Sequence, residues 1–326
     1  MRELFRKTLI IIICLMLSKM LHLNVSVYLV LFGVVVANTQ YSRHTWVLLF
    51  SMLPPVSAAV GAVLINQIFA SHPFIIWTIC VVYFDYTRRQ CTTNIQIRRA
   101  TLPLFMIIFI STYSSSIDRV EMIPYIIRDV IFSALLVALV ASMVNHLIPV
   151  RATPQQIKVI RLPVTGSDRL KMLLLVGGGL AFIMINEVTS AVFCLVPLIT
   201  SAMQPTHDFM KSHSKSKMLS QIGGCSLAVV MSIVYSGTEI NLFTYLIVSF
   251  ILVYTILYWI AHSTVDSRAI HTDALMGFLI PYQLYVAKYG NDFGLTSIAL
   301  RATELMIALL IIYACAYWLD RFSSNE

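Results

Sequence analysis

Apolar runs of helix length recur along nearly the whole chain, separated by short polar stretches. A bilayer core about 30 Å thick takes about 20 apolar residues per helix, and a helix satisfies its own backbone hydrogen bonds there. We therefore predict an all-α polytopic membrane protein with about twelve transmembrane helices, near residues 3–21, 24–41, 46–70, 74–87, 101–116, 125–148, 169–186, 188–204, 218–236, 242–261, 274–290 and 295–319.

The composition agrees with a lipid environment. Hydrophobic residues make up 58% of the chain and charged residues 12%, with a mean hydropathy of +0.82. Ordinary soluble domains carry roughly 25% charged residues, so a water-soluble fold is excluded. The net charge of +8 does not indicate nucleic-acid binding, because no basic stripe interleaved with aromatic residues accompanies it. The expected partner is the lipid bilayer.

Basic residues indicate how the chain is oriented. With both termini in the cytoplasm, only Lys19, Arg119, Arg128, Lys288 and Arg301 of the 23 Lys and Arg residues fall outside or within the membrane. The other 18 fall in the cytoplasmic segments, as the positive-inside rule requires. Both termini are therefore predicted to be cytoplasmic. The first helix is expected to be retained, because large residues follow its apolar run where a signal peptide has small ones.

The chain is predicted to consist of two six-helix repeats, residues 1–150 and 169–326, joined by a cytoplasmic linker over residues 151–168. A shift of 163 residues places Arg6 on Arg169, Ser57 on Ser220 and Gly61 on Gly224. Six spans per repeat would give parallel repeats. Each Ser-xxx-Gly step is expected to let two helix backbones approach closely. Chance similarity between two apolar segments is the alternative.

Ionisable pairs inside the predicted helices are the first functional candidates. Such groups cost several kcal/mol in hydrocarbon and usually mark a transport or proton path. Arg128 precedes Asp129, and a shift of 173 residues aligns Arg128 with Arg301, which Glu304 follows. Arg128 and Asp129 point about 100° apart on a helix, so we do not expect them to pair.

Glu304 is the deepest acid, about ten residues or roughly 15 Å into the last helix. Desolvation would favour the protonated form of Glu304, whereas a nearby Arg301 would favour its carboxylate. Such opposing effects suit a group that must gain and lose a proton. Glu304 and Asp129 are thus candidates for proton coupling, and Arg301 and Arg128 for binding a substrate anion. The alternative is that these groups bridge helices or anchor at headgroups.

Aromatic residues are the second set of candidates. Several tyrosines lie towards the predicted periplasmic side, where an interfacial belt explains most of them. Tyr282, Tyr285 and Tyr113 are also candidates for lining a site that stacks on an aromatic substrate. Lys19 is expected to extend outward to the interface. The six cysteines and eight histidines match no metal-ligand spacing, so no metal or cofactor is predicted.

The layout resembles the fusaric-acid-resistance and aromatic-acid exporter family of bacterial inner-membrane proteins, in a short form without the cytosolic domain. Each half begins with a basic stretch before two brief helices, and a late helix of each half opens with an arginine. The residues that carry this likeness are Arg6-Lys7-Thr8 with a turn at His22-Leu23-Asn24, and Asp168-Arg169-Leu170-Lys171 with a turn at Asn186-Glu187.

The resemblance implies export of small organic acids or drugs, driven by protons, with a periplasmic membrane-fusion adaptor as partner. Two other classes stay open. A channel or an assembly subunit of an envelope complex, with no catalysis, would need no deep carboxyl. A membrane-embedded enzyme acting on lipid-linked substrates would need a nucleophile, and His207-Asp208 and His271-x-Asp273 have none nearby in a recognisable motif. We therefore expect no enzyme; a homo-oligomer is compatible with the sequence.

Overall fold

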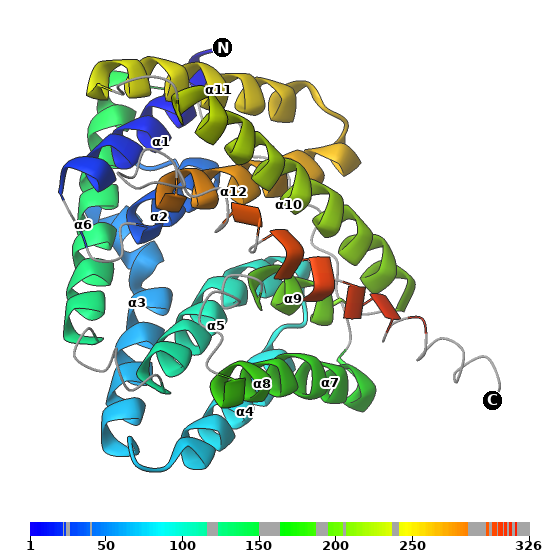
Figure 1. The fold of residues 1–326 in the computed structure, drawn as a ribbon. Helices are drawn as coiled ribbons and strands as arrows, with labels where there is room; N and C mark the ends of the chain where they lie inside the picture. Colours follow the sequence, from blue (N-terminus) through cyan, green and yellow to red (C-terminus); the bar gives the residue numbers. More distant parts are fainter. Residues whose placement is uncertain are drawn as a thin grey trace. The chain divides into compact units, whose positions relative to one another are not determined.

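The computed structural model describes most of the chain as helix (Figure 1). The described residues are 1–21, 23, 27–39, 41–115, 123–149, 164–186, 195–204, 207–236, 241–285 and 298–299, with 302–304, 306–308, 310–311, 313–314 and 317. They form helices and no β-strand. The all-α prediction is therefore confirmed for this part of the chain.

Five of the described helical segments are long and apolar enough to cross a membrane. They are Thr45–Ile68, Asn94–Thr112, Pro124–Leu147, Met210–Tyr235 and Leu242–His262, which belong to α3 (Thr45–Ile68), α5 (Asn94–Ser115), α6 (Ile123–Leu147), α10 (His207–Ser236) and α11 (Leu242–His262). The chain is thus an all-α protein with the helices of a membrane protein. The start of α10 differs from expectation, because residues 207–217 were predicted as a loop and are helical.

The remaining helices are shorter or more polar. α1 (Arg2–Met20) carries several charges, and α2 (Val27–Thr39) has only 13 residues. The others are α4 (Pro73–Gln90), α7 (Gly166–Met172), the π-helical segment η2 (Leu173–Gly177), α8 (Gly178–Asn186), α9 (Leu195–Ala202) and α12 (Val265–Tyr285). Within the predicted last span at 295–319, the residues that the structure describes are all helical. The two predicted tight turns each include residues outside the described part of the chain.

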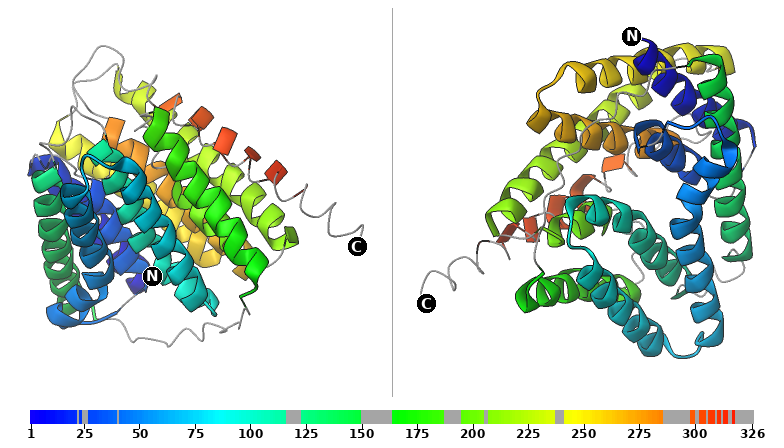
Figure 2. Two further views of the ribbon diagram at one scale, coloured as in Figure 1. Left: turned by 90° about the horizontal axis from the view of Figure 1, so that it is seen from below. Right: turned by 180° about the vertical axis from the view of Figure 1, so that it is seen from behind.

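The chain folds into two compact units. Unit 1 comprises Met1–Leu53, Arg128–Pro154 and Leu219–Ala302, and unit 2 comprises Pro54–Ile127, Gln155–Met218 and Thr303–Glu326. α1 packs on α2 and α11 in unit 1, and α12 packs on both α2 and α11. In unit 2, α4 packs on α5 and on the α7–η2 segment, and α5 on α8 (Figure 2). The predicted repeat boundaries stay a prediction.

Arg6 ties three helices of unit 1 together. Its side chain is buried, and its guanidinium donates to Asn145 Oδ1 at 2.9 Å and to the Ala37 carbonyl at 3.3 Å. Ala37 lies in the last turn of α2, where carbonyls lack helical partners. Asn145 on α6 in turn donates to the Ser42 carbonyl at 2.6 Å. This buried chain of hydrogen bonds fixes α1 and α6 against the end of α2.

An ion pair between Asp85 and Arg169 has the same role in unit 2. Arg169 at the start of α7 donates from Nε and Nη2 to the two carboxylate oxygens of Asp85 on α4, at 2.6 and 2.7 Å. α7 itself begins with a capping box, since Thr165 and Asp168 exchange hydrogen bonds between side chain and backbone. Further along, Trp77 Nε1 donates to the Gly177 carbonyl at 2.9 Å, at the end of the π-helical segment.

The two Ser-xxx-Gly steps behave differently. A Cβ on Gly224 would lie 2.5 Å from the Gly277 backbone, so α10 and α12 are in direct backbone contact there. Pro281 cannot donate to the Gly277 carbonyl four residues earlier, and the Cys225 thiol donates to that oxygen at 3.8 Å. A Cβ on Gly61 would meet nothing within 4 Å. The expectation of close packing is confirmed at Gly224 and wrong at Gly61.

This difference gives a matched test of packing. Gly224→Ala should destabilise the protein by about 1–3 kcal/mol, because the new methyl group would have to push two backbones apart. Gly61→Ala should leave the protein as stable or up to about 1 kcal/mol more stable, since alanine favours helix and the space is open. Apparent melting temperatures in detergent would measure both. Equal behaviour of the two variants would contradict the assigned packing.

Candidate functional site

Arg128 and Asp129 form an ion pair with each other, against our expectation. Arg128 donates from Nε and Nη2 to the same oxygen of Asp129, at 3.1 and 2.9 Å. The two Cβ atoms do point apart on α6, but the long arginine side chain folds back across that angle. Asp129 is fully buried while the Arg128 side chain is 59% exposed. The buried Asp129 therefore pairs with an arginine that reaches it from the surface of unit 1.

The other predicted site residues are only partly visible. Glu304 is helical and half-buried within unit 2, while Arg301, its expected neighbour, lies outside the described residues. Tyr113 and Tyr285 are helical, but their side chains are not described. Tyr282 is fully buried in unit 1. Among the predicted residues whose side chains the structure describes, Tyr282 belongs to a cluster of polar and aromatic groups.

The Tyr282 hydroxyl lies at the centre of a buried hydrogen-bonded chain. It shares one hydrogen bond of 3.1 Å with the Tyr235 hydroxyl and another of 2.7 Å with the Ser249 hydroxyl. Tyr235 lies in the last turn of α10, Ser249 about two turns into α11, and Tyr282 in the last turn of α12. All three side chains are buried. Three helices of unit 1 therefore meet at one polar centre within apolar surroundings.

Aromatic rings and a cation complete this centre. The Tyr245 ring stacks on the Tyr282 ring with centroids 5.3 Å apart and an interplanar angle of 8°. The Lys19 ammonium lies 5.6 Å from the Tyr245 ring centroid and donates to the Gln283 carbonyl at 3.1 Å. Lys19 therefore turns inward to α12 rather than outward, because a ring face and a carbonyl together replace water around its charge.

The Tyr245 hydroxyl is the unusual group of the cluster. Its residue is buried, and the oxygen lies near the Tyr282 and Ser249 hydroxyls without hydrogen-bond geometry to a described partner. A buried hydroxyl without a partner costs about 1–3 kcal/mol, so such groups call for a functional or structural explanation. The Lys19–tyrosine cluster (Lys19, Tyr235, Tyr245, Ser249 and Tyr282) thus combines stacked phenol rings, an ammonium group and a spare hydroxyl.

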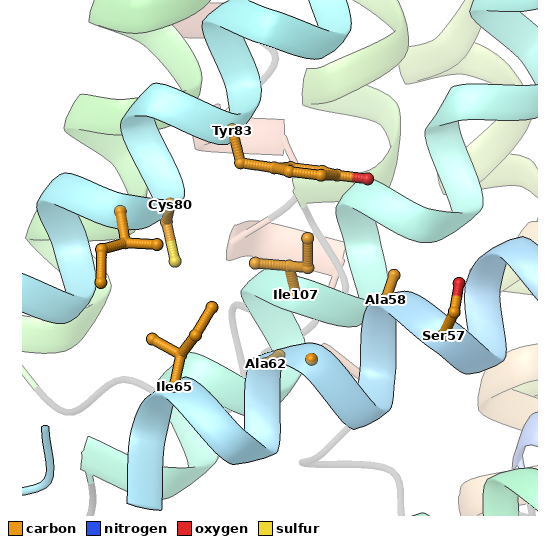
Figure 3. A pocket seen from close by; sticks show the side chains of 9 residues that line it. Ser57, Ala58, Ala62, Ile65, Cys80, Tyr83 and Ile107 are labelled. Atoms are coloured by element: carbon orange, nitrogen blue, oxygen red, sulfur yellow. The ribbon is translucent and has the colours of Figure 1, made fainter. Parts of the chain in front are cut away.

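Unit 2 contains a separate, apolar cavity of about 220 Å³ between α3, α4 and α5. In Figure 3, Tyr83 reaches from α4 over Ile107, and the small side chains of Ser57, Ala58 and Ala62 line the α3 side. The open space beside Gly61 is part of this cavity. No charged side chain lines it, so it suits an apolar group rather than an organic anion. Within the described residues, no three His, Cys, Asp or Glu side chains gather as metal ligands.

Sequence reasoning missed four members of the cluster: Lys19, Tyr235, Tyr245 and Ser249. One signal was available. Under the predicted topology, the end of the first span, the end of the 218–236 span and the start of the 242–261 span all lie on the same side as Tyr282. Which helices are neighbours is a tertiary property, however, and α1 contacts α11 although more than 200 residues separate them.

Comparison with known proteins adds little to this geometry. Residues 3–144 match the family described as "Protein of unknown function (DUF2955)". This match covers less than half of the chain, and its description assigns no activity. No curated protein matches the chain, and no solved structure matches it. The comparisons therefore do not support the resemblance to the aromatic-acid exporters by name, and the function rests on the site.

The hydrogen-bonded chain predicts a stability difference between two tyrosines. Tyr282→Phe should destabilise the protein by about 1–3 kcal/mol, because it leaves the buried Ser249 and Tyr235 hydroxyls without their shared partner. Tyr258→Phe on exposed α11 surface should have little effect. Thermal unfolding of the purified full chain would compare them. Equal melting temperatures for Tyr282→Phe and the unmodified protein would show that the hydroxyl chain is not formed.

Proposed function

We propose that this chain is an efflux transporter of the bacterial inner membrane that exports small organic acids, aromatic ones in particular, or related drugs. In this proposal the chain has about twelve spans in two parallel six-helix repeats, with both termini cytoplasmic. Export is coupled to protons, and a periplasmic membrane-fusion adaptor carries the substrate onward. The support comes from the residues of unit 1 and from the resemblance described above.

The observation that carries the proposal is the Lys19–tyrosine cluster. An aromatic carboxylate needs an aromatic surface for its ring and donors for its charge. The Tyr245 and Tyr282 rings offer the surface, with the stacked geometry that aromatic pairs favour. The Lys19 ammonium and the spare Tyr245 hydroxyl offer the donors.

In this proposal, the described arrangement is the closed form of the site. Tyr245 and Tyr282 stack on each other, so a substrate ring would have to replace one of them as the stacking partner. Such a replacement requires the end of α12 to move against the start of α11. Pro281, next to Tyr282, makes this movement easier, because the Gly277 carbonyl is held by the weak Cys225 thiol donor rather than by the helix.

Proton coupling in this proposal belongs to Glu304. It is half-buried in unit 2, and carboxyl groups at such places in membrane proteins commonly relay protons. Asp129 suits this role less well, because it is already engaged in a direct ion pair with Arg128. Arg301, three residues before Glu304, is proposed to bind the substrate anion. A channel without coupling is the competing function, and it makes opposite predictions for Glu304.

Lys19 gives the first test of the function. Lys19→Met should raise the KM for efflux of a labelled aromatic carboxylate such as benzoate about tenfold, the cost of one charge-assisted hydrogen bond. Lys19→Arg should retain most of the affinity. Lys7→Met, on the same helix but paired with Glu3, serves as the control for expression and folding. Unchanged efflux in Lys19→Met would rule out the cluster as the substrate site.

Glu304 gives the second test. Glu304→Gln should abolish efflux against a gradient in inverted vesicles, because the amide cannot take up and release a proton. Downhill exchange of labelled for unlabelled substrate should persist. A protonophore should have the same effect on the unmodified protein. Uphill efflux that survives both the variant and the protonophore would favour a pump driven otherwise, and purely downhill flux throughout would favour the channel.

A further inference from the structure

Arg88 occupies a core position on α4 where an apolar residue is expected. The buried face of α4 consists of Ile76, Cys80, Phe84 and Arg88, each four residues after the last. Arg88 is 0% exposed and is the largest of the fully buried side chains. A guanidinium cannot lose its charge in a protein, so it must be compensated where it lies.

The described residues compensate Arg88 only in part. Its Nη1 donates to the Cys91 carbonyl at 3.0 Å, just beyond the end of α4. Its Nε and Nη2 atoms have no hydrogen-bond partner in the described part of the chain. Burial lowers the pKa of Arg88, and the nearby Asp168 carboxylate opposes that shift. Unpaired buried N–H groups of a charged side chain commonly indicate an ion or water that binds there.

The carboxylates near Arg88 are already engaged. Asp168 accepts from Thr165 in the capping box and from Lys171 Nζ at 3.4 Å. Asp85 accepts from Arg169 on both oxygens and from Arg89 at 2.8 Å. Among the described residues, the four side chains of this basic cluster (Arg88, Arg89, Arg169 and Lys171) contact two carboxylates, so two positive charges are left over there. An anion is the missing component.

The surface around the basic cluster indicates which anion. On α4, exposed Val82 and Tyr86 lie on the same helix face as Arg89, whose side chain is 58% exposed. On the neighbouring segment, exposed Leu170 and Leu174 lie four residues apart on one face, and Arg169, which is 34% exposed, directly precedes Leu170 in the chain. Exposed apolar residues beside basic ones on both segments match the chains and the phosphate of a phospholipid, and basic pockets between helices bind anionic headgroups.

We propose that the basic cluster of unit 2 binds the phosphate of an anionic phospholipid, with Arg88 as its buried donor and Arg89 and Arg169 at its exposed side. The exposed arginines admit the headgroup by turning away from Asp85, and the Nε and Nη2 atoms of Arg88 then donate to the phosphate, a geometry that guanidinium and phosphate favour. This site is separate from the Lys19–tyrosine cluster, and it does not depend on the proposed transport.

The test measures binding of defined lipids to the purified full chain in detergent. Phosphatidylglycerol should raise the apparent melting temperature and remain bound in native mass spectrometry, while phosphatidylcholine with the same acyl chains should do so much less. Arg88→Met should weaken phosphatidylglycerol binding about tenfold, since it removes charge-assisted hydrogen bonds while keeping an unbranched side chain. Arg43→Gln, an exposed arginine of unit 1, should bind like the unmodified protein.

Each other outcome decides against part of the proposal. Equal stabilisation by the two lipids, or undiminished phosphatidylglycerol binding in Arg88→Met, would overturn the site. Should Arg88→Met fail to fold, Arg89→Gln at the exposed side carries the same test, with a smaller loss of binding expected. Stabilisation by inorganic phosphate alone, as strong as that by phosphatidylglycerol, would overturn the lipid and assign the site to free phosphate. None of these outcomes alters the efflux tests of Lys19 and Glu304.

Discussion

Polar groups inside an apolar helical protein must be satisfied by other groups of the protein, because hydrocarbon offers no hydrogen bonds. Several buried contacts of the described structure follow this constraint. Arg6 reaches the last turn of α2 and Asn145, and Asn145 reaches the Ser42 carbonyl. Asp85 takes both donors of the Arg169 fork. These contacts position the helices, because the two partners of each contact lie on different elements. A hydrogen bond between them is kept only while the two elements hold their relative position.

Where side chains are small, direct contacts between helix backbones also position the helices. Gly224 brings α10 against the Gly277 backbone of α12, and the carbonyl that Pro281 leaves open accepts from Cys225 on α10. The proline thus creates an acceptor that the neighbouring helix uses. This contact between α10 and α12 lies next to Tyr282, so the packing of the two helices also places the Tyr282 phenol at the centre of the Lys19–tyrosine cluster.

Two polar centres stand out because their hydrogen bonding is incomplete. The Tyr245 hydroxyl in unit 1 and the Arg88 guanidinium in unit 2 are both buried and both keep donors without partners among the described residues. Their surroundings differ in chemistry. Stacked phenol rings and one ammonium group suit an aromatic carboxylate, whereas four basic side chains beside apolar stripes suit a phosphate on a lipid. Each centre therefore suggests its own ligand, and the two proposals can fail independently.

The sequence determined the helical class and the membrane-like helices, because apolar length and charge content act along the chain. It placed the 242–261 span within one residue of α11, and the spans at 46–70 and 125–148 within two residues of α3 and α6. It also singled out Tyr282. It did not predict the partners of Tyr282, the inward turn of Lys19 or the pairing of Arg128 with Asp129. Only the tertiary structure decided these, since they depend on which helices are neighbours and on how a long side chain folds, and no local pattern encodes either.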